Sequence, residues 1–101
     1  MTGKWIPLTH PGVVLLEEYL KPLGISNYRL AKETGLTPTR IGQIARGERS
    51  ITPEAGLKIS KFLGMSEGFW VKKQASYDMH LAKRDHAAEL DKIQPLAAAS
   101  A

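Results

Sequence analysis

Apolar residues recur at helical spacing along most of this chain, and glycine, proline and capping residues divide the pattern into five predicted helices. The first is predicted from residue 11 or 12 to Lys21, where Pro22 and Gly24 would end it. Its predicted core stripe consists of Val13, Leu16, Leu20 and Leu23. The fourth begins with Thr52 as N-cap and ends at Gly64. Its predicted buried positions are Ala55, Ile59, Phe62 and Leu63.

The fifth helix is predicted to be the longest, from about residue 67 to residue 84, with an extension to Leu90 left open and Ser66 as its cap. Two apolar stripes follow it. One consists of Val71, Ala75, Met79 and Ala82, and the other of Trp70, Tyr77 and Leu81. Because two stripes exceed what one core contact requires, part of this helix is free for another surface. The chain is thus divided into an extended arm (1–9), one folded unit (10–92) and a flexible tail (93–101).

Between these helices, residues 26–49 (SNYRLAKETGLTPTRIGQIARGER) have the spacing of two short helices joined by a tight turn. Ser26 is the predicted N-cap of the first helix, and Gly35 supplies the positive-φ residue of the turn. Thr37 then caps a second helix that runs to about residue 46. On it, Ile41 and Ile44 turn inward, and small Ala31 lies where the two helices cross. The outward residues are Thr39, Arg40, Gln43 and Arg46.

An outward face with hydroxyl, guanidinium and amide groups has the chemistry needed to read base edges in a major groove. A helix–glycine–helix unit in a small all-α domain can also be mere packing. Charge favours the DNA-binding interpretation, because residues 26–50 carry five basic and two acidic side chains whereas residues 1–25 and 51–71 balance. We therefore expect a sequence-specific DNA-binding unit, its reader spanning residues 26–46.

Composition excludes several other functions. A chain of 101 residues has room for one modest core, and the absence of cysteine removes disulfides, thiolate catalysis and cysteine-ligated metals. There is no signal pattern and no apolar run long enough to span a membrane, so a cytoplasmic bacterial protein without membrane association is expected. His10, His80 and His86 do not share a helix face, and no glycine-rich loop or nucleophile is evident. We expect no enzyme, no metal site and no cofactor.

The pattern as a whole resembles the lambda-repressor-like, XRE-type DNA-binding domain, an all-α fold of five helices with a helix-turn-helix and a longer C-terminal helix. Within it, three stretches look like the HigA (VapI-like) family of antitoxins. They are HPGVVLLEEYLKPLGIS at 10–26, RIGQIARGERSIT at 40–52 and FLGMSEGFWVKKQASYDM at 62–79. The resemblance implies an antitoxin that represses its own operon as a dimer and neutralises a HigB-type toxin, a RelE-like mRNA endonuclease. A stand-alone repressor remains the alternative; an RNA-binding or structural adaptor lacks stacking aromatics near Arg40.

The resemblance also implies roles for individual residues. Base contacts fall on Pro38, Thr39, Arg40 and Gln43. Phosphate contacts fall on Asn27, Arg46 and Arg49, and for Asn27 the N-terminal end of its helix adds a physical reason, because unpaired amides converge there.

Two further surfaces are predicted. One recognition helix covers few base pairs, so useful specificity needs two half-sites on a palindrome, and we expect a homodimer with Tyr77 and Leu81 at its interface. The alternative is that Phe69, Trp70 and Tyr77 complete the monomer core. For the toxin, exposed Trp5 and the acidic pair Glu17 and Glu18 are candidate contacts to a basic nuclease, although Trp5 folding back and a solvated acidic face are the simpler interpretations.

Overall fold

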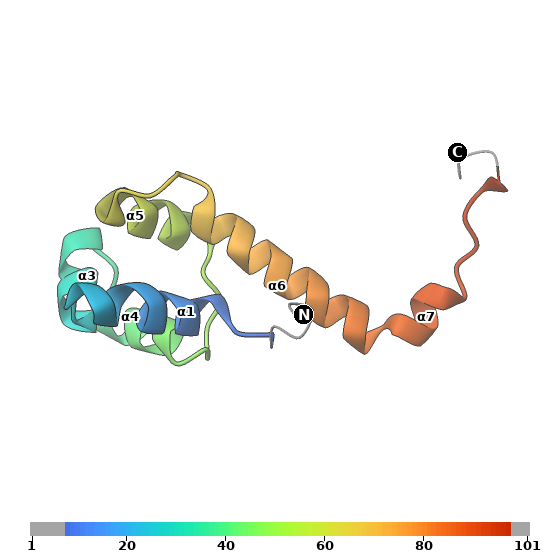
Figure 1. Cartoon of the computed structure of the whole chain (residues 1–101), viewed down its shortest axis with the longest axis horizontal. Coiled ribbons are helices and arrows are strands. Elements are labelled where there is room, and N and C mark those ends of the chain that lie inside the picture. Colours follow the sequence, from blue (N-terminus) through green and yellow to red (C-terminus); the bar gives the residue numbers. More distant parts are fainter. Residues whose placement is uncertain (1–7, 98–101) are drawn as a thin grey trace.

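The structure, a computed structural model, describes residues 8–97, and every regular element in that range is helical. The described elements are α1 (Pro11–Val14), the π-helical segment η2 (Leu15–Leu20), α2 (Lys21–Leu23), α3 (Asn27–Thr34), α4 (Pro38–Ala45), α5 (Pro53–Leu63), α6 (Phe69–Asp85) and α7 (Ala87–Asp91). Figure 1 shows α1, α3, α4 and α5 gathered into one body from which α6 projects, with α7 at its far end. The principal extents of 52 × 28 × 23 Å reflect this projection.

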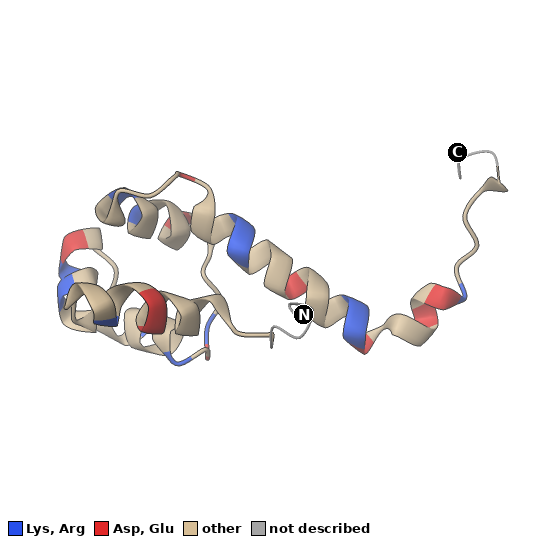
Figure 2. Cartoon of the chain, in the orientation of Figure 1, with Lys and Arg blue, Asp and Glu red and all other residues tan. Residues whose placement is uncertain are grey.

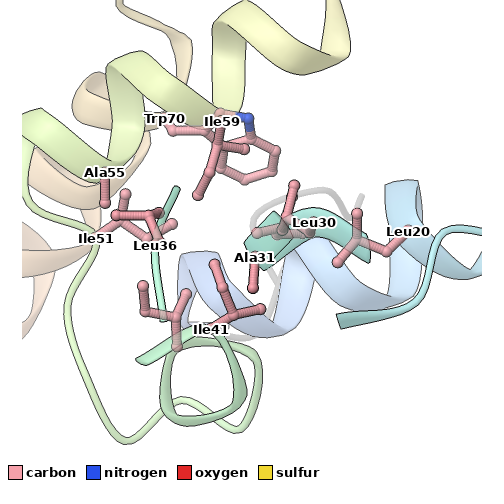
Figure 3. Close-up of a cluster of buried hydrophobic side chains, with 11 residues drawn as sticks. Leu20, Leu30, Ala31, Leu36, Ile41, Ile51, Ala55, Ile59 and Trp70 are labelled. Carbon is pink, nitrogen blue, oxygen red and sulfur yellow. The ribbon is translucent and has the colours of Figure 1, made fainter. Parts of the chain in front are cut away.

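The core lies where the helices of the body meet α6, and side chains from every part of the body point into it (Figure 3). Trp70, at the start of α6, is fully buried and packs edge-on against Tyr19 at a ring-centroid distance of 5.2 Å. Phe69 is partly buried against the same cluster. The alternative in which Phe69 and Trp70 complete the core of the monomer is therefore confirmed.

The first predicted helix differs from expectation in where it ends and in its hydrogen-bond spacing. Residues 11–23 form one continuous helical rod, and Pro22 lies inside it instead of ending it. The middle of this rod, η2, is π-helical: at its end the Lys21 N–H donates to the carbonyl of Leu16, five residues back. Proline has no N–H to lose, so a local change of hydrogen-bond spacing accommodates it at low cost.

The π-helical turn also changes which leucines are buried. Leu15 and Leu20, five residues apart, are both 0% exposed, whereas Leu23 is 61% exposed. The predicted stripe of Val13, Leu16, Leu20 and Leu23 is thus wrong at Leu23 and omits Leu15, because it assumed a uniform period of 3.6 residues.

The long helix α6 lies close to the range predicted from the sequence, but its two ends differ from the prediction. It begins at Phe69 with Gly68 as N-cap, and the side chain of Ser66 makes no cap bond; the Ser66 carbonyl accepts from the Phe69 N–H instead. It ends at Asp85, and the chain continues after a break at His86 as α7, which ends at Asp91. The predicted continuation to Leu90 is therefore helical but is a separate segment.

Candidate nucleic-acid interface

The helix-turn-helix is formed by α3, the turn at Gly35 and α4, and its capping residues act as predicted. The Ser26 hydroxyl accepts from the Arg29 N–H at 3.0 Å, and the Thr37 hydroxyl accepts from the Arg40 N–H at 3.1 Å. Gly35 has a φ of 79°, a left-handed conformation that only glycine adopts without cost. Each cap satisfies an amide that has no partner within its helix, so both helices start at a fixed residue.

The inner faces of the two helices are packed tightly enough to fix the outer face. Ala31 is 2% exposed, and Ile41 and Ile44 are 0% exposed. A Cβ on Gly12 would lie 1.7 Å from the carbonyl oxygen of Ile44, so α1 crosses directly over the end of α4. The position of α4 is therefore set by backbone contact as well as by side chains.

On the outer face of α4, Pro38 and Thr39 are exposed, and Gln43, one turn beyond Thr39, is half-buried. Residues at i and i+4 lie above one another on a helix, so Thr39 and Gln43 share one edge. A hydroxyl and an amide on one exposed edge fit the groove-reading face expected from the sequence.

Arg40 does not point outward with them. Its Nη2 donates to the Thr52 hydroxyl at 2.7 Å, its Nη1 lies 3.6 Å from Glu54, and its side chain is only 20% exposed. The guanidinium thus ties α4 to the start of α5. A base contact by Arg40 stays a prediction, and it requires the guanidinium to leave Thr52 and Glu54.

The loop after α4 carries two of the basic groups of the unit (Figure 2). Arg46 binds the carboxylate of Glu48 through two hydrogen bonds of 3.0 and 3.3 Å. These hydrogen bonds raise the pKa of Arg46 and lower the pKa of Glu48, so both groups stay charged. Arg49 instead donates from Nη1 to the side-chain carbonyl of Gln43 at 3.0 Å.

Asn27 occupies the first position of α3, beside the free amides of that helix terminus. Its side-chain oxygen is buried and has no hydrogen-bond partner among the described residues. The placement is compatible with the predicted phosphate contact, which stays a prediction.

The residues predicted at the dimer interface lie on α6. Tyr77 is half-buried and packs edge-on against His10 at 5.2 Å between ring centroids, and Leu81 is half-buried. Beyond them several apolar side chains on the projecting part of the chain are exposed. They are Met79, Leu90, Ile93 and Leu96.

The acidic pair predicted to meet a toxin lies on the exposed side of η2. Glu17 and Glu18 line a groove of about 800 Å³ between the first helical rod and α6, together with Tyr77 and His80. Glu17 also pairs with Lys21 at 2.9 Å. Trp5, the third predicted toxin contact, lies outside the described residues.

Sequence reasoning missed Gln74, which joins the segment between α4 and α5 to α6. It is 6% exposed; its carbonyl accepts from the Ile51 N–H at 2.8 Å, and its amide donates to Asp78 at 3.0 Å. The signal in the sequence was a polar residue, Gln74, among the apolar positions of the two stripes on this helix. This bond fixes the segment that follows the Arg46–Arg49 loop against α6.

Within residues 8–97 no group of three or more His, Cys, Asp or Glu side chains could hold a metal ion. No helix in the same range is long and apolar enough to cross a membrane.

Comparisons with known proteins agree with this geometry. The family model HTH_3, described as helix-turn-helix, matches residues 16–70. Virulence-associated protein I of Dichelobacter nodosus is 40% identical over 80 residues, which make up 79% of this chain and 74% of that protein. Antitoxin HigA-1 of Vibrio cholerae is 27% identical over 85 residues, or 84% of this chain and 80% of that protein.

A solved structure extends the similarity to the whole fold. The structure described as Pseudomonas aeruginosa antitoxin HigA with higBA promoter aligns at a TM-score of 0.83 and 25% identity, over 89% of this chain and 99% of that chain. The all-α fold with a helix-turn-helix and a longer C-terminal helix, expected from the sequence, is thereby confirmed.

Proposed function

Because this chain belongs to the HTH_3 family of helix-turn-helix proteins, and within it to the HigA (VapI-like) antitoxins, we propose that it is the antitoxin of a type II toxin–antitoxin module. In the bacterial cytoplasm it binds a palindromic operator as a homodimer, represses its own operon, and neutralises a HigB/RelE-like mRNA endonuclease. Its family consists of DNA-binding regulators, and the chain itself is not an enzyme.

The observation that carries the DNA-binding part is the exposed edge of α4. Thr39 and Gln43 lie one turn apart on a helix whose inner face is buried and whose start is fixed by the Thr37 cap. A rigid helix loses little entropy when its outer edge enters a groove, which favours specific over loose binding. In our proposal the base contacts come from Pro38, Thr39, Arg40 and Gln43.

Phosphate contacts surround this edge in the proposal. Asn27 and the free amides of α3 bind one backbone position, and Arg46 and Arg49 bind another beyond the end of α4. Because Arg46 is paired with Glu48, part of its charge is already compensated. The experiment is a titration of the DNA upstream of this gene at several salt concentrations, where Arg49→Ala should reduce the slope of log affinity against log salt by about one.

The proposed dimer forms along the projecting half of α6. Exposed Met79 is 55% accessible, and half-buried Tyr77 and Leu81 lie on the same helix. Two recognition helices held about 34 Å apart would fit consecutive turns of one palindrome. A charged residue at Leu81 would place an unpaired carboxylate in the apolar contact.

Leu81→Asp is therefore expected to give monomers in light scattering and to weaken operator binding. Lys83→Asp, two positions along and on the other side of the helix, is the matched control and should remain dimeric. A Leu81→Asp protein that stays a tight-binding dimer refutes this interface.

The proposed toxin surface is the acidic side of the first helical rod. Glu17 and Glu18 are exposed on η2 and border the groove against α6, where their two carboxylates would attract a basic nuclease. Trp5 is the third member of this surface by sequence alone.

Co-expression with the product of the neighbouring reading frame tests the antitoxin role. Growth arrest by the neighbour alone, with recovery and a stable complex when this chain is present, is the expected outcome. Trp5→Ala combined with Glu17→Lys should weaken that complex, whereas Glu33→Lys on α3 should not. A neighbour without toxicity and without binding would leave the stand-alone repressor as the function.

A further inference from the structure

The chain folds back on Gln43 immediately after α4. Gly47, with a φ of 77°, reverses the backbone, and its N–H donates to the carbonyl of Ile44 at 3.0 Å. The next residue, Glu48, donates its N–H to the backbone carbonyl of Gln43 at 2.8 Å. Arg49 then reaches the side-chain carbonyl of the same glutamine, Oε1, at 3.0 Å. Two successive loop residues, Glu48 and Arg49, therefore hold Gln43, which lies on the exposed edge of α4.

The charges in the loop leave Arg49 available for this contact. Glu48 is the nearest carboxylate in sequence, and both of its oxygens accept from Arg46. Arg40, the other guanidinium near α4, is bound to Thr52 and Glu54. The pairing of each arginine with a different partner assigns Arg49 to Gln43.

The chemistry of the pair fixes which end of the Gln43 amide faces outward. A guanidinium has donors only, so the atom that faces it must be the carbonyl oxygen. The Nε2 group, with its two N–H donors, is then the free end. Glutamine reads adenine by accepting from N6 with its oxygen and donating to N7 with its nitrogen, and here the bond from Arg49 occupies one of the two lone pairs of that oxygen.

We propose that Arg49 is a positioning residue that sets the base preference of Gln43, so that Gln43 presents donors and selects guanine, whose N7 and O6 are both acceptors, over adenine. The inference rests on the proposed operator binding and adds to it, because a phosphate contact by Arg49 would carry no sequence information. Arg49 acts here through Gln43 and need not touch the base.

Selection from a randomised operator library tests this with five proteins. Gln43→Ala identifies the base pair that Gln43 reads, because preference is lost there alone. The wild-type protein is expected to select guanine at that pair. Arg49→Ala should reduce the preference for guanine over adenine there by about tenfold or more, the range that one well-oriented contact supplies. Lys61→Ala, which removes one positive charge from an exposed position on α5, is the matched control and should leave the preference unchanged.

The outcomes separate the possibilities. If Arg49→Ala lowers affinity equally for all sequences and leaves the preference intact, Arg49 is a phosphate contact only and the inference is refuted. Arg49→Lys keeps the charge and a donor, so it should retain part of the guanine preference; a preference as low as that of Arg49→Ala contradicts the orienting role. Selection of no sequence by the folded wild-type protein refutes the proposed function, whereas selection of adenine at the Gln43 pair refutes this inference alone.

Discussion

Gly12→Ala offers a stringent test of how the recognition helix is held in place. The added Cβ would lie 1.7 Å from the Ile44 carbonyl oxygen, whereas ordinary contact begins at 3.4 Å, so the two backbones must separate by the difference, roughly 1.7 Å. Neither side of the clash is a flexible side-chain end, and overpacking that moves backbone costs about 3 kcal/mol or more. For a domain of this size such a loss lowers the Tm by about 12–24 °C.

The assay is urea unfolding followed by helical circular dichroism, with a thermal melt alongside. Gly42→Ala is the matched control, since its Cβ would meet only the flexible Nη1 of Arg46 at 3.2 Å. That substitution lies inside α4 and should stabilise the protein by about 0.5–1 kcal/mol through helix propensity. A Gly12→Ala protein as stable as the wild type would show that α1 does not press on the end of α4.

Three further predictions concern single residues. Burial lowers the pKa of His10 below 6.5, against an opposing effect of Asp78, and the His10 Nδ1 accepts a hydrogen bond from the Gly12 N–H at 2.9 Å. The stability that neutral His10 contributes is therefore complete above pH 6.5 and is lost as the pH falls through the pKa of the folded state. His10→Asn should flatten the dependence of the unfolding free energy on pH in that window. An unchanged pH dependence would contradict this. Gln74→Met should cost about 1–3 kcal/mol in urea unfolding, because the buried Ile51 N–H loses its acceptor; equal stability would mean that another acceptor replaces it. Leu15→Ala should cost about 2–5 kcal/mol and Leu23→Ala less than about 0.5, and the reverse order would refute the π-helical register.

Much of the fold follows from local chemistry that the sequence displays. Ser26, Thr37 and Thr52 each accept from the amide three residues on, as capping residues should, and Gly35 and Gly64 end their helices in the left-handed conformation. Such signals involve neighbours along the chain, so no knowledge of tertiary structure is needed to interpret them.

The structure differs from the sequence predictions where contacts between distant residues, or an altered hydrogen-bond pattern, determine which way a side chain points. The burial of Leu15 and the exposure of Leu23 accompany a five-residue hydrogen bond from Lys21 to Leu16, which a uniform period of 3.6 residues does not anticipate. The direction of Arg40 depends on Thr52 and Glu54, twelve or more positions along the chain, whose approach only the packed structure reveals. The sequence therefore predicts which helix carries the exposed edge of α4 better than it predicts which side chains of that helix point outward.

In the proposed function the exposed edge of α4, with Thr39 and Gln43, reads the operator. Fluorescence anisotropy with the DNA upstream of this gene tests it most directly, using a Thr39→Ala, Gln43→Ala double variant. Ser66→Ala with Gln94→Ala removes the same chemical groups from exposed positions outside α4 and serves as the control. The first variant, still folded, is expected to lose about a hundredfold or more of its specific affinity, while the control keeps it. Equal affinity of the two variants for the operator would contradict base reading by α4.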